Sequence, residues 1–426
     1  MATGLTFAIE TLGCKTNLVE SDAIADLLVR HGHRRVEFDS SADAYIINTC
    51  TVTQSGDKKS RQLIRRAKKQ NPNSTVIVMG CYSQLEPEEV AALEGVDHVL
   101  GTANRSAVLR LLDPESAQSS LIDVTDIMEV TEFEEIPLYQ APGHTRAFIK
   151  IQEGCEQYCT YCIIPYARGK VRSRSLESIV QEVARLSEQG FSEFVLTGIH
   201  IGSYGKDFGG SPSLLDVIEE LSAQKGVARI RLGSIEPRTI DEEFVSRLKG
   251  NRKLCDHFHL SLQSGSDPVL KRMNRKYRKE EFRAGVARLK TMFADPALTT
   301  DIIVGFPGET EEQFEETMDF VREIGFSDVH VFPYSPRKGT PAANFSQIVP
   351  ADVKKIRAER LRVLAEELGA KYRERFEHSA LPILIEKIER QAGLYRLSGY
   401  TSNYLYRTFT LAEGEAAPRI GEIFSN

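Results

Sequence analysis

Three cysteines within eight residues constrain this chain more than any other feature of its sequence. Cys155, Cys159 and Cys162 lie in the segment EGCEQYCTYCIIPYARGKVRSR, directly after an alternating apolar strand predicted at Phe148–Ile151. A closed structural zinc site takes four ligands, and zinc ribbons use separated CxxC pairs. Three gathered thiolates therefore favour an iron–sulfur cluster with one open iron. Three unrelated buried thiols are improbable at this density, because free cysteine is scarce.

The CxxxCxxC spacing, with Tyr161 just before the third cysteine, resembles the signature of the radical S-adenosylmethionine (SAM) enzymes. The resemblance implies that Cys155, Cys159 and Cys162 hold a [4Fe-4S] cluster and that Tyr161 contacts the cofactor. It also implies that the open iron chelates the methionine part of SAM. Reductive cleavage of SAM would then yield a 5′-deoxyadenosyl radical.

Composition sets the broad class. The 426 residues, 41% hydrophobic and 27% charged, are enough for two or three globular domains. No apolar run has the length of a membrane span, and the start lacks a signal-peptide pattern, so we expect a cytoplasmic protein with its seven cysteines reduced. The net charge of −6 does not indicate a nucleic-acid partner, although an acidic chain can still carry local basic faces.

The first 112 residues alternate apolar strands with amphipathic helices, which predicts a small parallel α/β domain. Cys14, Cys50 and Cys81 each follow the carboxyl end of a different predicted strand. Ligands bind at that edge of open α/β sheets, so we expect the three thiols to converge in a second three-thiolate cluster. The predicted strands are Thr6–Leu12, Ala44–Asn48, Thr75–Met79 and His98–Leu100, and the predicted helices are Leu18–Arg30, Asp57–Lys69, Pro87–Leu93 and Ser106–Leu112.

GCxxN at Cys14 and NTC at Cys50, followed by the radical SAM loop, resemble the radical SAM methylthiotransferases. CKTN and CTVT most resemble the branch that modifies N6-threonylcarbamoyladenosine beside the tRNA anticodon. The resemblance implies two [4Fe-4S] clusters, SAM, a tRNA anticodon stem-loop as partner, and electron and sulfur donors of unknown identity. The expected reaction is methylthiolation of C2 of N6-threonylcarbamoyladenosine at position 37. Methylthiolation of N6-isopentenyladenosine in tRNA, or of a ribosomal protein, remains an alternative.

From Arg146 onward, six strand and helix units in series predict a partial (β/α)6 barrel, open on one side for a large substrate. By resemblance, the polar strand ends form a SAM pocket, with Gly198 near the methionine and Ser234, Glu236, Gln263 and Gly305 near the nucleoside. Glu309 follows the strand end at Gly305 and is as well suited to the first turn of the next helix as to this pocket, because a carboxylate there complements the helix dipole. The predicted strands are Phe148–Ile151, Glu193–Leu196, Arg229–Leu232, His257–Leu262, Thr299–Val304 and Val329–Pro333, and the clearest helices are Leu176–Gln189, Ser213–Ala223, Glu280–Met292 and Glu311–Ile324.

Three basic segments are candidates for contact with RNA phosphates. Charge runs are usually solvated helix faces, but these lie near the predicted cysteine edges of an acidic chain. The candidates are Lys58, Arg65 and Arg66 on the second helix, Arg168, Arg172 and Arg174 after the cluster loop, and the run KRMNRKYRK from Lys271 to Lys279.

A long charged helix, Pro350 to about Arg375, leads into four short alternating runs: Ile383–Ile388, Tyr395–Gly399, Leu405–Leu411 and Glu422–Phe424. They predict a small antiparallel β-barrel that resembles the TRAM module. The expected domains are residues 1–125, 140–370 and 371–426. Tyr400, Tyr404 and Tyr406 either stack on bases or fill the barrel core, and Cys255 is expected to pack as a small apolar side chain.

A non-catalytic iron–sulfur protein using the same six thiols is the competing class. An electron carrier is served better by four-cysteine clusters, because complete ligation shields the iron. Two three-cysteine sets favour catalysis.

Overall fold

The computed structural model describes residues 4–51, 54–113, 121–140, 143–391, 393–412 and 419–425. The chain forms two compact units. The first comprises Met1–Pro142, Lys150–Arg174 and Arg337–Thr340, and the second comprises Gly143–Ile149, Ser175–Pro336 and Pro341–Asn426. The division passes through strand β7 (Ala147–Glu153), so the cysteine loop after β7 belongs to the first unit.

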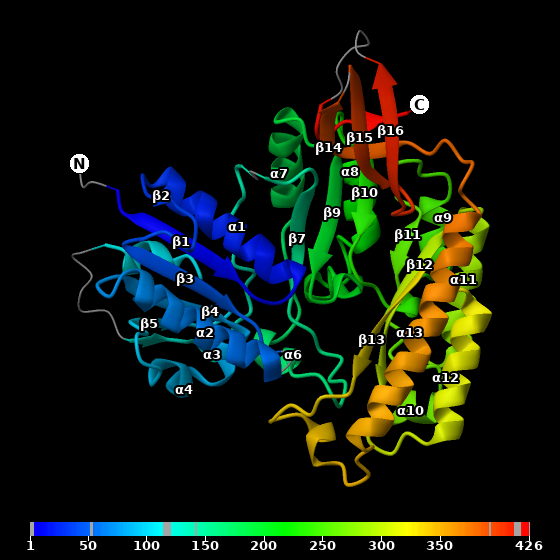
Figure 1. Ribbon diagram of the computed structural model, residues 1–426, viewed down its shortest axis with the longest axis horizontal. Helices are drawn as coiled ribbons and strands as arrows, with labels where there is room; N and C mark the ends of the chain where they lie inside the picture. The colour runs from blue at the N-terminus through cyan, green and yellow to red at the C-terminus, as the bar shows by residue number, and fades with distance from the viewer. Residues whose placement is uncertain are drawn as a thin grey trace. The chain divides into compact units, whose positions relative to one another are not determined.

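A parallel sheet is the centre of the first unit, with strand order β2-β1-β3-β4-β5-β6 among the described residues (Figure 1). Every registered pair in it is parallel. All six residues of β3 are buried, as expected of a parallel strand covered on both faces. The strands are β1 (Thr6–Thr11), β2 (Arg34–Arg35), β3 (Ala44–Thr49), β4 (Thr75–Gly80), β5 (His98–Leu100) and β6 (Ile122–Asp123).

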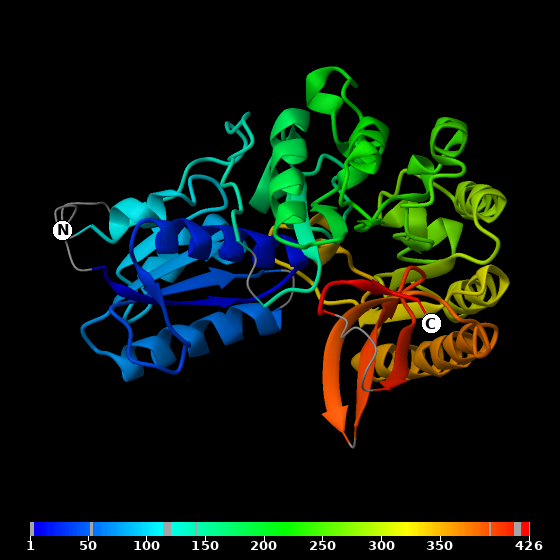
Figure 2. The ribbon, with the colours of Figure 1, turned by 90° about the horizontal axis from the view of Figure 1, so that it is seen from above.

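Helices cover both faces of this sheet. The side chains of α1 (Lys15–Arg30) and α5 (Ala107–Leu111) pack with Phe7 and Ile9 on one face. On the other face, α2 (Gln54–Gln70), α3 (Cys81–Leu85) and α4 (Pro87–Ala91) pack around Tyr45 and Ile47. Figure 2 shows α1 and α2 on opposite sides of the blue strands. The alternation of side chains along each strand thus fills two separate cores.

The expected barrel strands are present. One sheet has the order β10-β9-β7-β8 and another has the order β11-β12-β13, and a parallel bridge from Ile235 to Leu260 joins the two groups. Of these strands, β8 and the end of β7 lie in the first unit and pair antiparallel with each other. The strands are β7, β8 (Arg172–Ser173), β9 (Glu193–Gly198), β10 (Arg229–Leu232), β11 (His257–His259), β12 (Ala297–Val304) and β13 (Asp328–Pro333).

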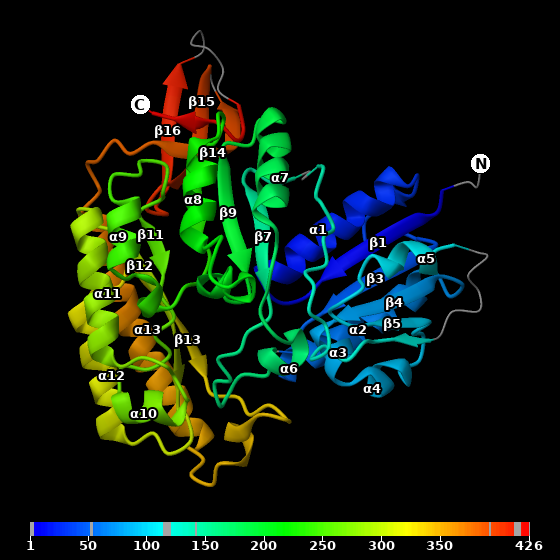
Figure 3. The same cartoon turned by 180° about the vertical axis from the view of Figure 1, so that it is seen from behind.

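Helices of the second unit lie outside its strands, with α11, α12 and α13 side by side on the outer side of β11 to β13 (Figures 1 and 3). Ser213 caps α8 and Thr310 caps α12, each in a reciprocal capping box. None of the described helices is both long enough and apolar enough to cross a bilayer. The helices are α7 (Leu176–Glu188), α8 (Leu214–Ala223), α9 (Glu242–Leu248), α10 (Asp267–Arg272), α11 (Lys279–Met292), α12 (Glu311–Ile324) and α13 (Ala351–Glu374), with 3-10 turns at Ile201–Ser203, Lys206–Phe208, Pro237–Thr239 and Pro341–Asn344.

The last strands form an antiparallel sheet of order β16-β15-β14-β17 within the described residues. It packs a small core of Ile383, Ile385 and Leu397. The expected fold class is confirmed: a parallel α/β region, a radical SAM core and a C-terminal antiparallel half-barrel. The strands are β14 (Ile383–Gln391), β15 (Leu394–Thr401), β16 (Tyr406–Ala412) and β17 (Ile423–Phe424).

The three C-terminal tyrosines form an aromatic cluster instead of a barrel core. The Tyr400 and Tyr404 rings stack with centroids 4.7 Å apart, and Tyr406 meets Tyr400 edge-on at 5.2 Å. The Arg231 guanidinium lies 4.7 Å from the centroid of Tyr404. Tyr406 is 51% exposed. The rings are thus held by cation–π contacts at the surface.

Candidate functional site

The first unit brings Cys14, Cys50 and Cys81, the N-terminal trio, to the carboxyl edge of its sheet. Cys14 precedes α1, Cys50 follows β3, and Cys81 opens α3 directly after β4. Gly13 lies so close to Cys50 that an added Cβ would be 2.7 Å from the Cys50 Cβ and 2.9 Å from its Sγ. Cys14 and Cys50 also lie close enough to Cys81 to affect the pKa of its thiol, so the three residues meet at one edge, as strand order predicts.

Side-chain hydrogen bonds from the GCxxN and NTC motifs link these strand ends. The Asn17 amide donates to the Leu12 carbonyl (2.9 Å) and to the Thr49 carbonyl (3.0 Å), so it joins the Cys14 loop to the Cys50 loop. The Thr49 hydroxyl donates to the Met79 carbonyl at 2.7 Å, which joins the Cys50 loop to the strand that leads to Cys81. Asn17 thus ties the loop of Cys14 to that of Cys50, and Thr49 ties the loop of Cys50 to the strand before Cys81.

The three thiols differ in exposure: Cys14 is exposed, Cys50 is half-buried and Cys81 is buried. Burial raises the pKa of the Cys81 thiol to about 12, and Arg168 opposes that rise while Cys14 and Cys50 add to it. A thiolate at Cys81 therefore needs a neighbouring cation or a metal ion. The donor set, three soft sulfurs at one edge with one exposed member, fits an iron–sulfur cluster that keeps an open iron.

The second set, Cys155, Cys159 and Cys162, forms the loop trio. Gly154 has φ +74°, and an added Cβ would lie 1.8 Å from the Lys170 carbonyl oxygen. The Cys155 N–H donates to the Gly169 carbonyl at 3.0 Å, and the Cys162 N–H donates to the Cys159 carbonyl at 2.9 Å. The loop therefore closes on itself through its backbone, and its three thiols also fit a three-ligand cluster. Tyr161 is half-buried within this loop.

Arg168 lies at the end of α6 (Ile164–Arg168), which lies beside α3 (Figures 1 and 3). Its side chain is fully buried. Its Nε donates to Cys81 Sγ at 3.2 Å, and its remaining N–H groups reach Glu20, Glu153 and Asn17. The expected phosphate contact of Arg168 is wrong, because a guanidinium with no exposed surface cannot reach a tRNA backbone.

Arg168 belongs to a set of five side chains that we call the buried charge network: Glu20, Arg105, Lys150, Glu153 and Arg168. Burial by itself would raise the pKa of both glutamates. The three cations outweigh burial and hold the pKa of Glu20 below its usual value and that of Glu153 well below it. Both carboxylates are consequently ionised inside the protein.

The other expected RNA contacts divide into buried and exposed groups. Arg172 is 2% exposed and Arg174 is 4% exposed, so neither presents a cation to solvent. The phosphate contacts expected of these two residues are therefore wrong, like that of Arg168. Arg172 instead donates to the Arg168 carbonyl at 3.0 Å. Lys58, Arg65 and Arg66 of α2 are exposed, although Arg66 pairs with Asp39. The described part of α2 therefore keeps an accessible basic face, and Lys271, Lys276 and Arg278 of the third segment are exposed as well.

In the second unit, the residues expected to bind SAM lie at the strand ends. Gly198 ends β9, and Ser234 follows β10 with its hydroxyl 2.7 Å from that of Ser261. Gln263 has φ +67° and Gly305 has φ +69°. These conformations let the backbone turn closely at the ends of β11 and β12.

Two glutamates at this edge are held by arginines. Glu236 pairs with Arg275 at 2.8 Å; burial raises its pKa, but the contacts with His200 and Arg275 lower it overall. Arg275 comes from the basic run Lys271–Lys279, so part of that run has a structural role. Glu309 precedes the cap of α12, accepts from the Gly305 N–H at 3.0 Å and pairs with Arg357 at 2.8 Å.

Sequence reasoning missed several polar groups near these sites. Arg337, from the segment that joins the first unit, donates to the Thr51 hydroxyl next to Cys50. His259, Asp301 and His330 lie on β11, β12 and β13 with their ligand atoms within 4.8 Å of one another. An ordinary strand pattern surrounds each, so only the strand register shows that they meet.

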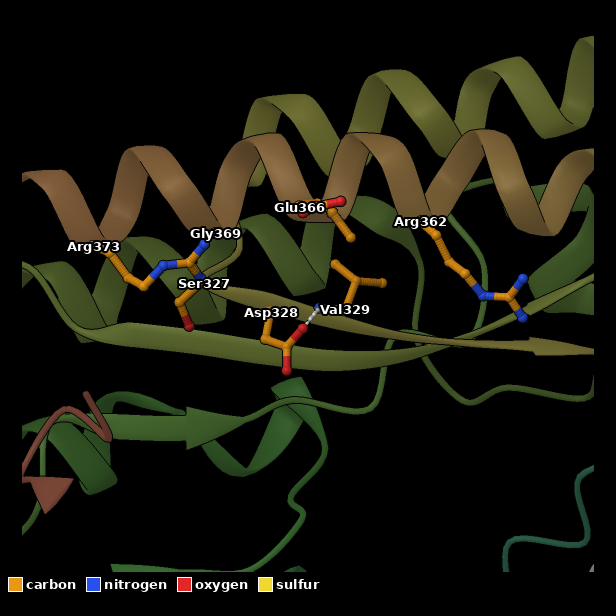
Figure 4. A pocket seen from close by; sticks show the side chains of 8 residues that line it. Ser327, Asp328, Val329, Arg362, Glu366, Gly369 and Arg373 are labelled. Carbon is orange, nitrogen blue, oxygen red and sulfur yellow. Dashed lines mark hydrogen bonds between the residues drawn. The ribbon is translucent and has the colours of Figure 1, made fainter. Parts of the chain in front are cut away.

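One open pocket lies away from the strand ends. It has a volume of about 310 Å³ and is lined by Ser327, Asp328, Arg362, Glu366 and Arg373 (Figure 4). Ser327 directly precedes β13, Asp328 is its first residue, and the other three belong to α13. The pocket is therefore at the amino end of the strand, opposite the edge where chemistry occurs in such barrels.

Comparisons with known proteins agree with this arrangement. The family model of the radical SAM superfamily matches residues 149–321, and that of the uncharacterized protein family UPF0004 matches residues 6–101. The solved structure of the radical SAM methyltransferase TsrM from Kitasatospora setae has a TM-score of 0.60 at 14% identity, covering 80% of this chain and 77% of that one, which shows likeness of fold alone.

Curated relatives narrow the family. The threonylcarbamoyladenosine tRNA methylthiotransferase MtaB of Bacillus subtilis is 44% identical over 95% of this chain and 90% of its own. That of Aquifex aeolicus is 41% identical over 87% and 89%. A tRNA-2-methylthio-N(6)-dimethylallyladenosine synthase of Geobacillus thermodenitrificans is 36% identical over 94% and 77%.

The fold and the loop trio define a radical SAM enzyme, a class that uses a [4Fe-4S] cluster and SAM. With the N-terminal trio and these relatives, the chain belongs to the radical SAM tRNA methylthiotransferases, enzymes that transfer a methylthio group.

Proposed function

We propose that this protein methylthiolates C2 of N6-threonylcarbamoyladenosine at position 37 of tRNA, using SAM and two [4Fe-4S] clusters in the cytoplasm. The observation that carries the proposal is the convergence of Cys14, Cys50 and Cys81 in a chain that also holds the loop trio. The relatives support the substrate. This chain spans 90% of the Bacillus subtilis MtaB length but 77% of the Geobacillus dimethylallyladenosine enzyme.

The two trios have different tasks in this proposal. Cys155, Cys159 and Cys162 would hold the cluster that supplies the chemistry of SAM cleavage, and the strand ends at Gly198, Ser234, Glu236, Gln263 and Gly305 would orient SAM. A cluster with an open iron supplies, when bound, the electron for that cleavage. Cys14, Cys50 and Cys81 hold the sulfur-bearing cluster, and the exposed position of Cys14 leaves that edge accessible to the nucleoside.

Substrate choice depends on the N6 arm of the adenosine. A threonylcarbamoyl arm carries a carboxylate and a hydroxyl, whereas an isopentenyl arm is apolar, so the first calls for a cation and hydrogen-bonding groups. Arg168 cannot serve, because all of its side chain is buried. Arg337 is a half-buried cation that donates to the Thr51 hydroxyl beside Cys50. Its position, instead of that of Arg168, supports the carboxylated arm as the substrate.

The test is mass spectrometry of tRNA nucleosides from cells with and without this protein, followed by turnover on defined RNAs. We expect 2-methylthio-N6-threonylcarbamoyladenosine to disappear with the protein. Anticodon stem-loops bearing threonylcarbamoyladenosine should react, and those bearing isopentenyladenosine should not, since a cationic group would lose its partner. Equal turnover of both RNAs, or modification of a ribosomal protein, would overturn the substrate assignment.

A further inference from the structure

The guanidinium of Arg168 makes hydrogen bonds through all three of its nitrogens, and one of them is to a cysteine sulfur. A guanidinium has five N–H donors in a fixed fork. In Arg168, Nη1 donates to Glu20 and to Glu153 (3.1 Å), Nη2 donates to Glu20 (3.2 Å) and to Asn17 (2.5 Å), and Nε donates to Cys81 Sγ (3.2 Å). Four acceptors hold the fork in place, so the remaining Nε–H is aimed at a cysteine sulfur.

The charge of the surroundings favours an anion at that sulfur. The buried charge network contains three cations and two carboxylates. Arg105 also pairs with a third carboxylate, Glu134, at 3.1 Å; Glu134 is 18% exposed and accepts hydrogen bonds from Ser106 as well. The Arg168 Nε lies 3.2 Å from Cys81 Sγ and its side chain is fully buried, so this cation favours negative charge at the sulfur, or on a cluster bound to it, in a region where an isolated charge would be costly.

The partners of Arg168 reach across the sequence. Asn17 and Glu20 lie on α1, directly after Cys14, whereas Arg168 lies six residues beyond Cys162. Asn17 also bonds the Cys50 loop through the Thr49 carbonyl. One side chain therefore contacts the sulfur of one N-terminal cysteine and the elements that position the other two.

We propose that Arg168 is a positioning residue of the N-terminal trio, whose hydrogen bond to Cys81 Sγ raises the reduction potential of the iron–sulfur cluster bound there. Hydrogen bonds to ligand sulfurs and nearby positive charge stabilise the reduced, more negative state of such clusters. This inference rests on the proposed function, which assigns a cluster to Cys14, Cys50 and Cys81.

The experiment isolates that cluster. In the full-length Cys159→Ala variant, the loop trio lacks a ligand, so the remaining cluster signal reports the N-terminal trio. Iron and sulfide content come first. If no cluster assembles in this background, the two-cluster part of the proposed function fails, and with it the basis of this inference; an assembled cluster allows the inference to be tested by itself.

An electron paramagnetic resonance redox titration then compares three further substitutions in that background. Arg168→Gln should shift the midpoint to more negative potential by at least tenfold in the reduction equilibrium, about 59 mV for one electron. Arg168→Lys, which keeps the charge but removes the Nε–H donor, should shift it less. Arg105→Lys is the matched control, because Arg105 contacts Glu20 and Glu153 of the same network but not Cys81.

A measurement on the unsubstituted arginine covers the case in which Arg168 variants fail to fold. With guanidinium nitrogen-15 in the arginines, hyperfine spectroscopy of the reduced cluster should detect a coupled nitrogen. No nitrogen coupling in an assembled cluster, or an equal potential shift from Arg105→Lys and Arg168→Lys, would overturn the proposal.

Discussion

The two cysteine trios are built in opposite ways. The loop trio comes from eight consecutive residues, and the surrounding loop is closed by the hydrogen bond from the Cys155 N–H to the Gly169 carbonyl. The N-terminal trio comes from three strand ends, separated by more than 30 residues each, and is joined by Asn17 and Thr49. A local set depends on turn geometry, whereas a distributed set depends on the sheet that brings its members together. Substitutions should therefore disrupt the two trios in different ways.

Removing one ligand from each trio gives the largest expected effect. Cys159→Ala should reduce 5′-deoxyadenosine formation to background and leave the iron of the N-terminal trio, because the ligands of the two trios are separate. Cys50→Ala should preserve some SAM cleavage but end methylthio-nucleoside formation. Iron analysis and mass spectrometry of both products check this pair. Loss of all iron from Cys159→Ala would mean that the two trios do not assemble independently.

A change in the buried charge network should destabilise the first unit as a whole. Glu20→Gln leaves Arg105, Lys150 and Arg168 with one fewer buried carboxylate, which costs about 3–5 kcal/mol of unfolding free energy when a buried pair is broken. Chemical denaturation measures the loss. Arg247→Gln, in a more solvent-exposed ion-pair cluster, is the control and should cost far less.

The same network predicts an acid transition. The folded pKa values of Glu20 and Glu153 lie below the usual 4.5, so their ionised forms stabilise the folded unit above about pH 4.5. That stabilisation should be lost as pH falls through the folded pKa values. In Glu20→Gln the Glu20 part of this dependence should vanish. A parallel pH dependence in both proteins would contradict the assignment.

Two glycines test local against distributed construction directly. Gly154→Ala forces a Cβ against the Lys170 carbonyl and should cost the loop trio its iron, whereas Gly13→Ala, crowded by Cys50, should affect the N-terminal trio. Left-handed backbone strain adds about 1–3 kcal/mol at either position. Gly190→Ala is the matched control, because φ is +97° but no atom lies within 4 Å of the added Cβ. Iron content of each variant decides the outcome.

The basic face of α2 should contribute a smaller, salt-dependent effect. Neutralising Lys58, Arg65 and Arg66 should weaken tRNA binding and reduce the log–log salt slope by about one unit for each lost phosphate contact. Binding assays over a range of salt concentrations measure the slope, with exposed Arg322→Gln of α12 as the control. An unchanged slope would assign α2 to an ordinary solvated face.

The seventh cysteine should matter least. Cys255 is 2% exposed, and burial raises its pKa to about 11, so it is a protonated packing group. Cys255→Ala should cost roughly 1 kcal/mol of stability and no iron. Thermal unfolding and iron analysis together separate this cysteine from the other six.

Sequence patterns predicted the parts of this molecule that depend on local periodicity. Helix α12 was predicted with the same limits that it has in the structure, Glu311–Ile324, and the barrel strands were placed to within a few residues. The five-residue helices α3 and α6 were missed, because one turn is too short to show a helical period. Spacing identified the loop trio, and strand order identified the N-terminal trio.

Burial of charge could not be predicted in the same way. The run after Cys162 suggests an exposed basic face, yet Arg168, Arg172 and Arg174 are all buried. For Arg168 the partner is Glu20, 148 residues away on α1, whereas Arg172 donates to the Arg168 carbonyl. A basic run in the sequence shows where the cations are, but it does not show whether a distant carboxylate pairs with them in the fold.

The buried charge network also limits how the protein can be divided. A cut near residue 140, where the sequence suggests a domain boundary, separates Glu20 and Arg105 from Lys150, Glu153 and Arg168. Each fragment would carry buried charges without their partners. The modules suggested by the sequence are thus not interchangeable parts: a barrel fragment joined to a foreign N-terminal domain would leave Lys150 and Arg168 without the carboxylate of Glu20.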